Sequence, residues 1–147
     1  MGKFLTKLIT EQISEATPNS RAKYRLIDAL IYDSKTVGLI VVPEGFITDF
    51  ASVPRVPIAY LVAGGLGNSA ACLHDFLYTD PHLAMQKSCE PVSREEADLV
   101  LRGAIIDGMA ADIGVSIVGA IKSIYYVAIA HGMYLAVRCL GFRHWQK

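Results

Sequence analysis

Hydrophobic residues form short strand-like runs in the first third of the chain. Residues 24–32 and 37–42 are rich in Ile, Val, Leu and Tyr, and four polar residues, 33–36, join them. Runs of this composition with a short polar link are typical of a β-hairpin. A turn at residues 43–45 and the segment 46–48 add a short third strand. The pattern therefore predicts a small antiparallel sheet.

Before these strands, residues 1–16 carry apolar side chains near helical spacing. Thr17 and Pro18 begin a polar segment that interrupts the spacing. We therefore expect a short amphipathic helix that forms an N-terminal arm over residues 1–20. The apolar positions behind this expectation are Phe4, Leu5, Leu8, Ile9 and Ile13.

After the strands the pattern changes to a helical one. Three glycines within residues 61–67 indicate an irregular segment. Asn68 or Ser69 can then cap a helix that runs to about Thr79. We expect a loop over residues 80–92, because prolines stand near both of its ends.

Two longer helices complete the helical half. Ser93 and Glu96 form the capping-box pattern just before a periodic apolar run, which predicts a helix over residues 94–109. A last helical stretch covers about residues 113–140.

The length of 147 residues, with 52% hydrophobic and 19% charged residues, suits one domain with a full core. We expect a single α+β domain, in which the small antiparallel sheet packs on three or more helices. Its parts are the N-terminal arm, the sheet with the following corner over residues 23–55, and the helical part over residues 56–141.

Charge and cysteine content narrow the class of function. Lys plus Arg and Asp plus Glu number 14 each, which argues against nucleic-acid binding. The three cysteines are odd in number and lack metal-site spacing, which favours a reducing compartment. Residues 1–9 lack the apolar core and cleavage site of a signal peptide, so we expect synthesis in a cytoplasm.

The last helical stretch allows two interpretations. Between residues 113 and 137 the ionisable side chains are Lys122, His131 and tyrosines, and about 20 apolar residues span a bilayer. A lysine near the centre costs about 3 kcal/mol on insertion. We expect a buried core helix, with contact to a membrane or to a large apolar partner as the alternative.

His74, Asp75 and Tyr78 form the pattern with the most chemistry. On a helix, His74 and Tyr78 are four residues apart and share a face. Such a group can orient a water molecule, with His74 as general base. Asp98, on the antiparallel helix after Ser93, can fix the histidine tautomer. The same residues can instead form a hydrogen-bonded cluster that satisfies polar groups in the core.

The corner over residues 48–55 is the second candidate. Asp49 and Ser52 can bond backbone amides in a turn, and Pro54 prevents helix continuation. Asp49 is therefore a structural corner residue or a ligand.

Arg138 lies in the apolar last helix and requires a carboxylate partner. We expect a cluster around it with at least three members in hydrogen-bond range of one another. Its predicted members are Asp49, His74, Asp75, Asp98 and Arg138.

Four motifs follow one another in a fixed order between residues 23 and 145. They are Val42-Pro43-x-Gly45-Phe46-x-Thr48-Asp49-Phe50-Ala51-Ser52-Val53-Pro54-Arg55, Ala70-Ala71-x-x-His74-Asp75-x-Leu77-Tyr78, Ser93-Arg94-x-x-Ala97-Asp98 and Met133-Tyr134-x-Ala136-Val137-Arg138-x-x-Gly141. Together they resemble a phage and prophage family catalogued as domain-of-unknown-function family 1353. The resemblance implies a phage or prophage origin and no established activity.

Residues 70–78 also resemble, more locally, the active-site helix of phospholipases A2, including the short viral ones. This resemblance implies His74 as general base, with Tyr78 and Asp98 as the supporting network. It implies Asp75 as a calcium ligand, and Asp49 is the other candidate ligand. The sheet before the site departs from those enzymes.

These observations support three functional hypotheses. The leading one is a phage-encoded accessory or structural virion protein of the tail or its junctions. It would be made in the host cytoplasm and act by contact with other virion proteins or with copies of itself. The alternatives are a small calcium-dependent hydrolase that uses His74, and a membrane-associated phage protein.

Overall fold

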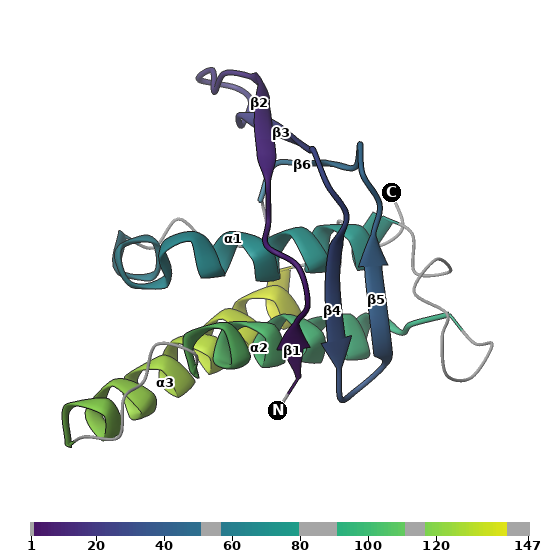
Figure 1. Cartoon of the computed structure of the whole chain (residues 1–147). Helices are drawn as coiled ribbons and strands as arrows, with labels where there is room; N and C mark the ends of the chain where they lie inside the picture. The colour runs from purple at the N-terminus through teal and green to yellow at the C-terminus, as the bar shows by residue number, and fades with distance from the viewer. Residues whose placement is uncertain (1, 51–56, 80–90, 111–116, 141–147) are drawn as a thin grey trace.

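The computed structural model describes residues 2–50, 57–79, 91–110 and 117–140 of the chain. Within these ranges, strands precede helices, and the predicted α+β class is confirmed (Figure 1). The strands are β1 (Lys3–Phe4), β2 (Thr10–Ser14), β3 (Lys23–Leu26), β4 (Leu30–Ser34), β5 (Gly38–Val42) and β6 (Ile47–Thr48). The helices are α1 (Pro57–Thr79), α2 (Arg94–Ala110) and α3 (Ile117–Leu140).

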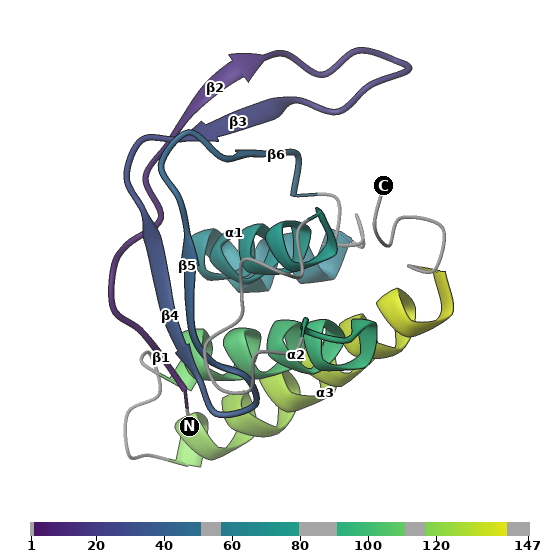
Figure 2. The ribbon, with the colours of Figure 1, turned by 90° about the vertical axis from the view of Figure 1, so that its right-hand side faces the viewer.

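The described strands form two small antiparallel sheets, with the orders β1–β4–β5 and β2–β3–β6, where the sequence predicts one. The predicted hairpin is present as β4 and β5, with Leu30 opposite Val42 and Ser34 opposite Gly38. The predicted first run is divided at residues 27–29, because β3 pairs with β6 and β4 pairs with β5. Figure 2 shows the β1–β4–β5 sheet standing against one side of the helices, with the second sheet beyond α1.

The predicted N-terminal helix is wrong, because this segment contributes β1 and β2 to the two sheets. From Lys3 to Thr10 the side chains alternate between exposed and half-buried, which is the period of an extended strand. Phe4 turns inward, and its ring centroid lies 4.7 Å from that of Tyr32. Leu5 stays 53% exposed. Over so short a segment, apolar residues near the spacing of a helix can also be accommodated in strands. Backbone pairing with β3 and β4 selects the strands.

Helix α1 begins earlier than the sequence predicts and contains the three glycines that were expected to be irregular. A glycine in a helix costs about 1 kcal/mol relative to alanine, which is too little to end a helix packed against its neighbours. Pro57 stands at the first helical position, where its missing N–H costs nothing. The predicted end at Thr79 is confirmed.

Helix α2 begins as predicted, because Ser93 and Glu96 form a capping box. The backbone N–H of Ser93 donates to Oε2 of Glu96 at 2.8 Å, and the N–H of Glu96 donates to Oγ of Ser93 at 3.3 Å. Helix α3 ends at Leu140, as expected.

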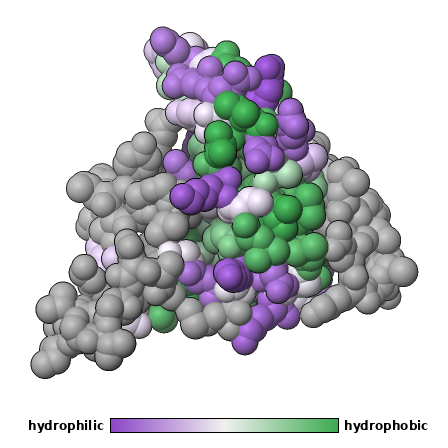
Figure 3. Space-filling view, viewed as in Figure 1, coloured by the Kyte–Doolittle hydropathy of each residue, from purple (hydrophilic) through white to green (hydrophobic). Residues whose placement is uncertain are grey.

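The core lies between the inner face of β4–β5 and the helices. The outward-facing Ile31, Leu39 and Val41 are only half-buried, and Figure 3 shows a hydrophobic area over these strands. The largest fully buried side chains include Leu30, Tyr32, Ile40, Leu73, Phe76, Leu77, Leu101 and Ile105.

Among the described side chains of α3, those of Ala130, Met133 and Val137 are buried, and they share one side of the helix. Its opposite side includes Ile124, which is 73% exposed. The expectation of a buried core helix therefore holds for one of its faces. Across the described ranges, no helix combines the length and apolarity needed to cross a bilayer.

Candidate functional site

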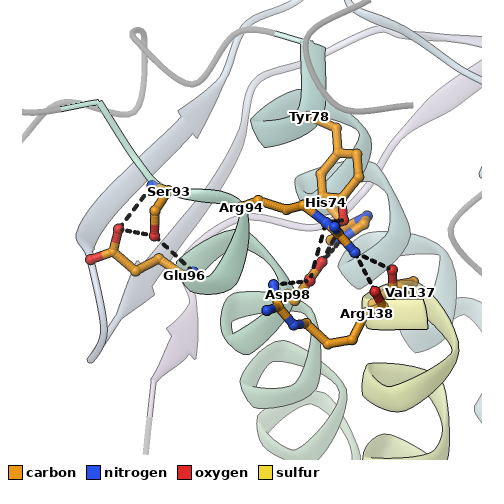
Figure 4. A network of polar contacts seen from close by, with 8 residues as sticks. All are labelled: His74, Tyr78, Ser93, Arg94, Glu96, Asp98, Val137 and Arg138. Atoms are coloured by element: carbon orange, nitrogen blue, oxygen red, sulfur yellow. Dashed lines mark hydrogen bonds and ion pairs between the residues drawn. The ribbon is translucent and has the colours of Figure 1, made fainter. Parts of the chain in front are cut away.

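The carboxylate of Asp98 lies fully buried where the three helices meet (Figure 4). Its Oδ1 accepts hydrogen bonds from Nε2 of His74 at 2.9 Å and from the hydroxyl of Tyr78 at 2.6 Å. Its Oδ2 lies 3.3 Å from a terminal nitrogen of Arg138 and 3.9 Å from Nε of Arg94. We call these five residues the Asp98 network. It joins side chains of α1, α2 and α3 around one negative charge.

Helical spacing explains how α1 and α2 present their side chains to the network. His74 and Tyr78 are one turn apart on α1, and their ring centroids lie 4.0 Å apart. Arg94 and Asp98 are one turn apart on α2, which places the guanidinium beside the carboxylate. Each helix therefore brings two members to the same side.

Arg94 also ties α2 to the end of α3. One of its terminal nitrogens donates to the backbone carbonyl of Val137 at 3.1 Å and to that of Arg138. These carbonyls belong to the last turn of α3, where backbone acceptors have no partner within the helix. A cation is also favourable at this negative end of the helix dipole. The network therefore holds Arg138 from both its backbone and its side chain.

Opposing influences act on the pKa of Asp98. Burial is the largest and raises it, but hydrogen bonds from His74 and Tyr78, together with Arg138, outweigh burial and lower the pKa. Asp98 is therefore ionised at neutral pH. Burial and the bond to Asp98 raise the pKa of Tyr78 to about 12, so its hydroxyl stays protonated and donates.

The state of Asp98 determines the tautomer of His74. An ionised carboxylate only accepts hydrogen bonds, so Nε2 of His74 must carry a proton. In the neutral imidazole, Nδ1 then has the lone pair, which is the arrangement of a general base. The ring of His74 is 1% exposed.

Asp75, the neighbour of His74, connects α1 to the corner that follows β6. Its Oδ2 accepts the hydroxyl of Thr48 at 2.6 Å, and Oγ1 of Thr48 accepts the N–H of Phe50 at 3.0 Å. Phe50 has a φ of 52°, a left-handed conformation that costs an ordinary residue about 1–2 kcal/mol. Asp49 lies half-buried between Thr48 and Phe50. Residues 48–50, the described start of the corner, are therefore tied to α1 through Asp75.

The predicted calcium site, with Asp75 and Asp49 as ligands, is still a prediction. In the described part of the chain, no three His, Cys, Asp or Glu side chains gather to hold a metal ion. Calcium takes 6–8 oxygen ligands, and one oxygen of Asp75 already accepts from Thr48. The described side chains therefore do not fit a calcium ion by themselves. Residues 51–56, which complete the corner, lie outside the described residues.

Of the residues expected to converge, the structure brings His74 and Arg138 to Asp98, with Tyr78 beside them. Arg94 was not predicted as a member, although its four-residue spacing from Asp98 was a usable signal. The role of Thr48 was not predicted either, because its partner is 27 residues away in sequence. His82 and His144 lie outside the described residues.

The comparisons with known proteins point to one family. A family model described as "Protein of unknown function (DUF1353)" matches residues 24–129. The match runs from β3 into α3 and includes His74, Tyr78, Arg94 and Asp98, while Arg138 lies beyond it. No match was found among curated proteins or among solved structures.

Proposed function

The chain belongs to the DUF1353 family of proteins of unknown function, and we propose that it is a hydrolase of carboxylic esters with His74 as its general base. The observation that supports this proposal is the buried pair of His74 and Asp98, with Nε2 and Oδ1 2.9 Å apart. Tyr78 donates to the same carboxylate oxygen and fixes its orientation. A histidine whose far nitrogen is held by a carboxylate is the arrangement that general-base catalysis uses.

In the proposed reaction, Nδ1 of His74 removes a proton from a water molecule as the water oxygen attacks the ester carbonyl carbon. The tetrahedral intermediate then breaks its bond to the alkoxide, and the proton on Nδ1 passes to that leaving group. The products are a carboxylic acid and an alcohol. Asp98 is a positioning residue, because it holds the tautomer and offsets the charge of the imidazolium. General-base assistance of this kind contributes roughly 10²–10⁴-fold in rate.

Apolar surroundings support a lipid ester as the substrate class. Leu73, Phe76 and Leu77 on the same helix are fully buried core residues, so His74 is carried by a helix with largely apolar surroundings. The resemblance of residues 70–78 to the phospholipase A2 helix supports the same class. Because the ring of His74 is 1% exposed, a covering group has to move before a carbonyl carbon reaches it.

The proposal is tested by release of fatty acid from phosphatidylcholine vesicles. The wild-type protein is compared with His74→Gln, which keeps polarity but has no basic nitrogen. His131→Gln is the matched control, because His131 is an exposed histidine on α3. We expect release by the wild type and by His131→Gln, and none by His74→Gln. Absence of release by the wild type, or equal release by His74→Gln, would refute the proposal.

The same assay with calcium and with a chelator tests the predicted calcium site. Loss of release in the chelator would support a role for Asp75 as a ligand. Undiminished release would mean that the protein groups of the Asp98 network suffice.

The exposed face of α3 favours a second candidate function, a component of a phage particle that binds another virion protein. Ile124 is 73% exposed, Tyr125 and Val127 are 41% exposed, and Leu135 is 49% exposed. Between residues 123 and 137 the helix carries no Asp, Glu, Lys or Arg. Exposed apolar patches often mark contact sites with other proteins. This face would supply the contact.

Mass spectrometry of purified phage particles tests this second candidate. We expect the chain at a constant ratio to the other virion proteins, and a clear loss when Ile124 is replaced by Lys. Asp28→Lys is the control, because Asp28 is an exposed residue between β3 and β4. Absence of the chain from purified particles would contradict this role.

A further inference from the structure

A hollow of about 310 Å³ opens between the turn of the β4–β5 hairpin and the outer side of α2. None of its lining residues belongs to the Asp98 network. Its volume is at the lower end of small-molecule sites, which span roughly 300–1,000 Å³. The hollow therefore suits a small ligand, and its chemistry is independent of the proposed hydrolase.

One lining residue of the hollow carries a polar group without a hydrogen-bond acceptor. Arg102 contributes to the lining, and its Nε is buried without a hydrogen-bond partner among the described residues. A buried N–H in this state is unfavourable unless an acceptor reaches it. The hydroxyl of Tyr32, by contrast, donates to Oδ2 of Asp107 at 2.7 Å. Arg102 is therefore a cationic lining residue whose donors are not all used within the protein.

The charges of the lining favour an anion with a single charge. Lys35 and Arg102 supply two positive charges and Asp107 supplies one negative charge, so one positive charge is left over. A carboxylate matches this balance better than a doubly charged phosphate monoester. A guanidinium also binds a carboxylate through two parallel hydrogen bonds.

Apolar side chains form the rest of the wall. Leu99 and Ile106 are seven residues apart on α2, with Arg102 and Gly103 between them on the same face. A Cβ at Gly103 would stand 3.7 Å from the hydroxyl oxygen of Tyr32, which is an ordinary contact distance. An apolar chain can therefore lie along α2 while its charged end meets Arg102.

We propose that this hollow binds a small organic carboxylate, with the carboxylate held by Arg102 and Lys35 and the hydrocarbon chain along Leu99 and Ile106. Hexanoate is the probe. A ligand of this size binds with a dissociation constant of about 1 mM at ordinary ligand efficiency. Hexanol tests the need for charge, and inorganic phosphate tests whether any small anion suffices.

Binding is measured by titrating the full chain while amide chemical shifts of α2 and the β4–β5 turn are recorded. Arg102→Gln should weaken hexanoate binding about tenfold or more, because it removes a charge-assisted hydrogen bond. Lys35→Gln, on an exposed turn, should weaken it a few-fold with the fold intact. Arg25→Gln is the matched control, because Arg25 pairs with Glu11 away from the hollow.

The expected result is saturable binding of hexanoate with shifts confined to the hollow, and binding of hexanol and phosphate that is at least about tenfold weaker. Three results would overturn the proposal: no saturation by hexanoate, equal binding of hexanol or phosphate, or unchanged affinity in both Arg102→Gln and Lys35→Gln.

Discussion

Replacing Asp98 with Asn tests whether the Asp98 network holds the three helices together. The substitution preserves shape but removes the charge, and the amide nitrogen cannot accept hydrogen bonds. The carboxylate is fully buried and accepts bonds from His74 and Tyr78, which are also buried. A hydrogen bond to a charged group contributes about 1.5–3 kcal/mol, so the two bonds together contribute roughly 3–6 kcal/mol.

Two features place the expected loss at the lower end of that range. Asparagine keeps one acceptor oxygen, which can still bond His74 or Tyr78. The Arg138 and Arg94 contacts are long, at 3.3 and 3.9 Å, and both guanidinium groups are partly exposed, so their loss is screened by water. We expect a loss of about 3 kcal/mol in the free energy of unfolding. For a chain of this length, that lowers Tm by roughly 6–12 °C.

The loss is measured by urea unfolding followed by circular dichroism. The slope of the unfolding free energy against urea concentration should be the same in the variant and the wild type, which shows unchanged cooperativity. Asp28→Asn is the control, because Asp28 is exposed and bonds only its neighbouring amide among the described contacts. It should stay within about 0.5 kcal/mol of the wild type. A loss below about 1 kcal/mol in Asp98→Asn would refute the inference that this carboxylate joins the helices.

Three further predictions follow from the same contacts. Because the folded state lowers the pKa of Asp98, its stabilisation is present above the unfolded pKa of about 3.9 and is lost as pH falls through the folded pKa. The difference in urea midpoint between wild type and Asp98→Asn should therefore be full at pH 7 and pH 5 and smaller at pH 3, and a constant gap would contradict this. Arg94→Gln should lower the free energy of unfolding by about 1–2 kcal/mol, because the last carbonyls of α3 lose their donor. In the same unfolding experiment, Arg25→Gln should lower it by less than about 1 kcal/mol, because it breaks a half-exposed ion pair. Ser93→Ala should cost about 1 kcal/mol in thermal melts by removing the capping box of α2, and an unchanged Tm would show that the cap is not needed.

The sequence predicted the parts of the fold that depend on local signals. The capping box at Ser93 located the start of α2, and the polar link between β4 and β5 located the hairpin. The segment before residue 17 was wrongly predicted as a helix, because its apolar residues lie near helical spacing over only a few turns. Pairing with distant strands selects strands there. No local signal at residues 27–29 showed that β3 and β4 would join different sheets.

The site was predictable where helical spacing placed residues on one face. His74, Tyr78 and Asp98 came from the spacing within α1 and from the expected antiparallel packing of α2. Arg138 was expected to need a carboxylate, but the sequence left three candidates, and packing of α3 against α2 selects Asp98. The hydrogen bond between Thr48 and Asp75 depends on how β6 is placed against α1 in the fold. The spacing of residues along the sequence does not predict this placement.

One ratio of initial rates tests whether His74 acts as a general base held by Asp98. It compares the release of fatty acid from phosphatidylcholine vesicles by His74→Gln with the release by His131→Gln, at equal folded fraction. We expect His131→Gln to keep about the wild-type rate and the rate of His74→Gln to fall by roughly 10²-fold or more. Equal rates for the two variants, or no release by the wild-type protein, would contradict this role of His74.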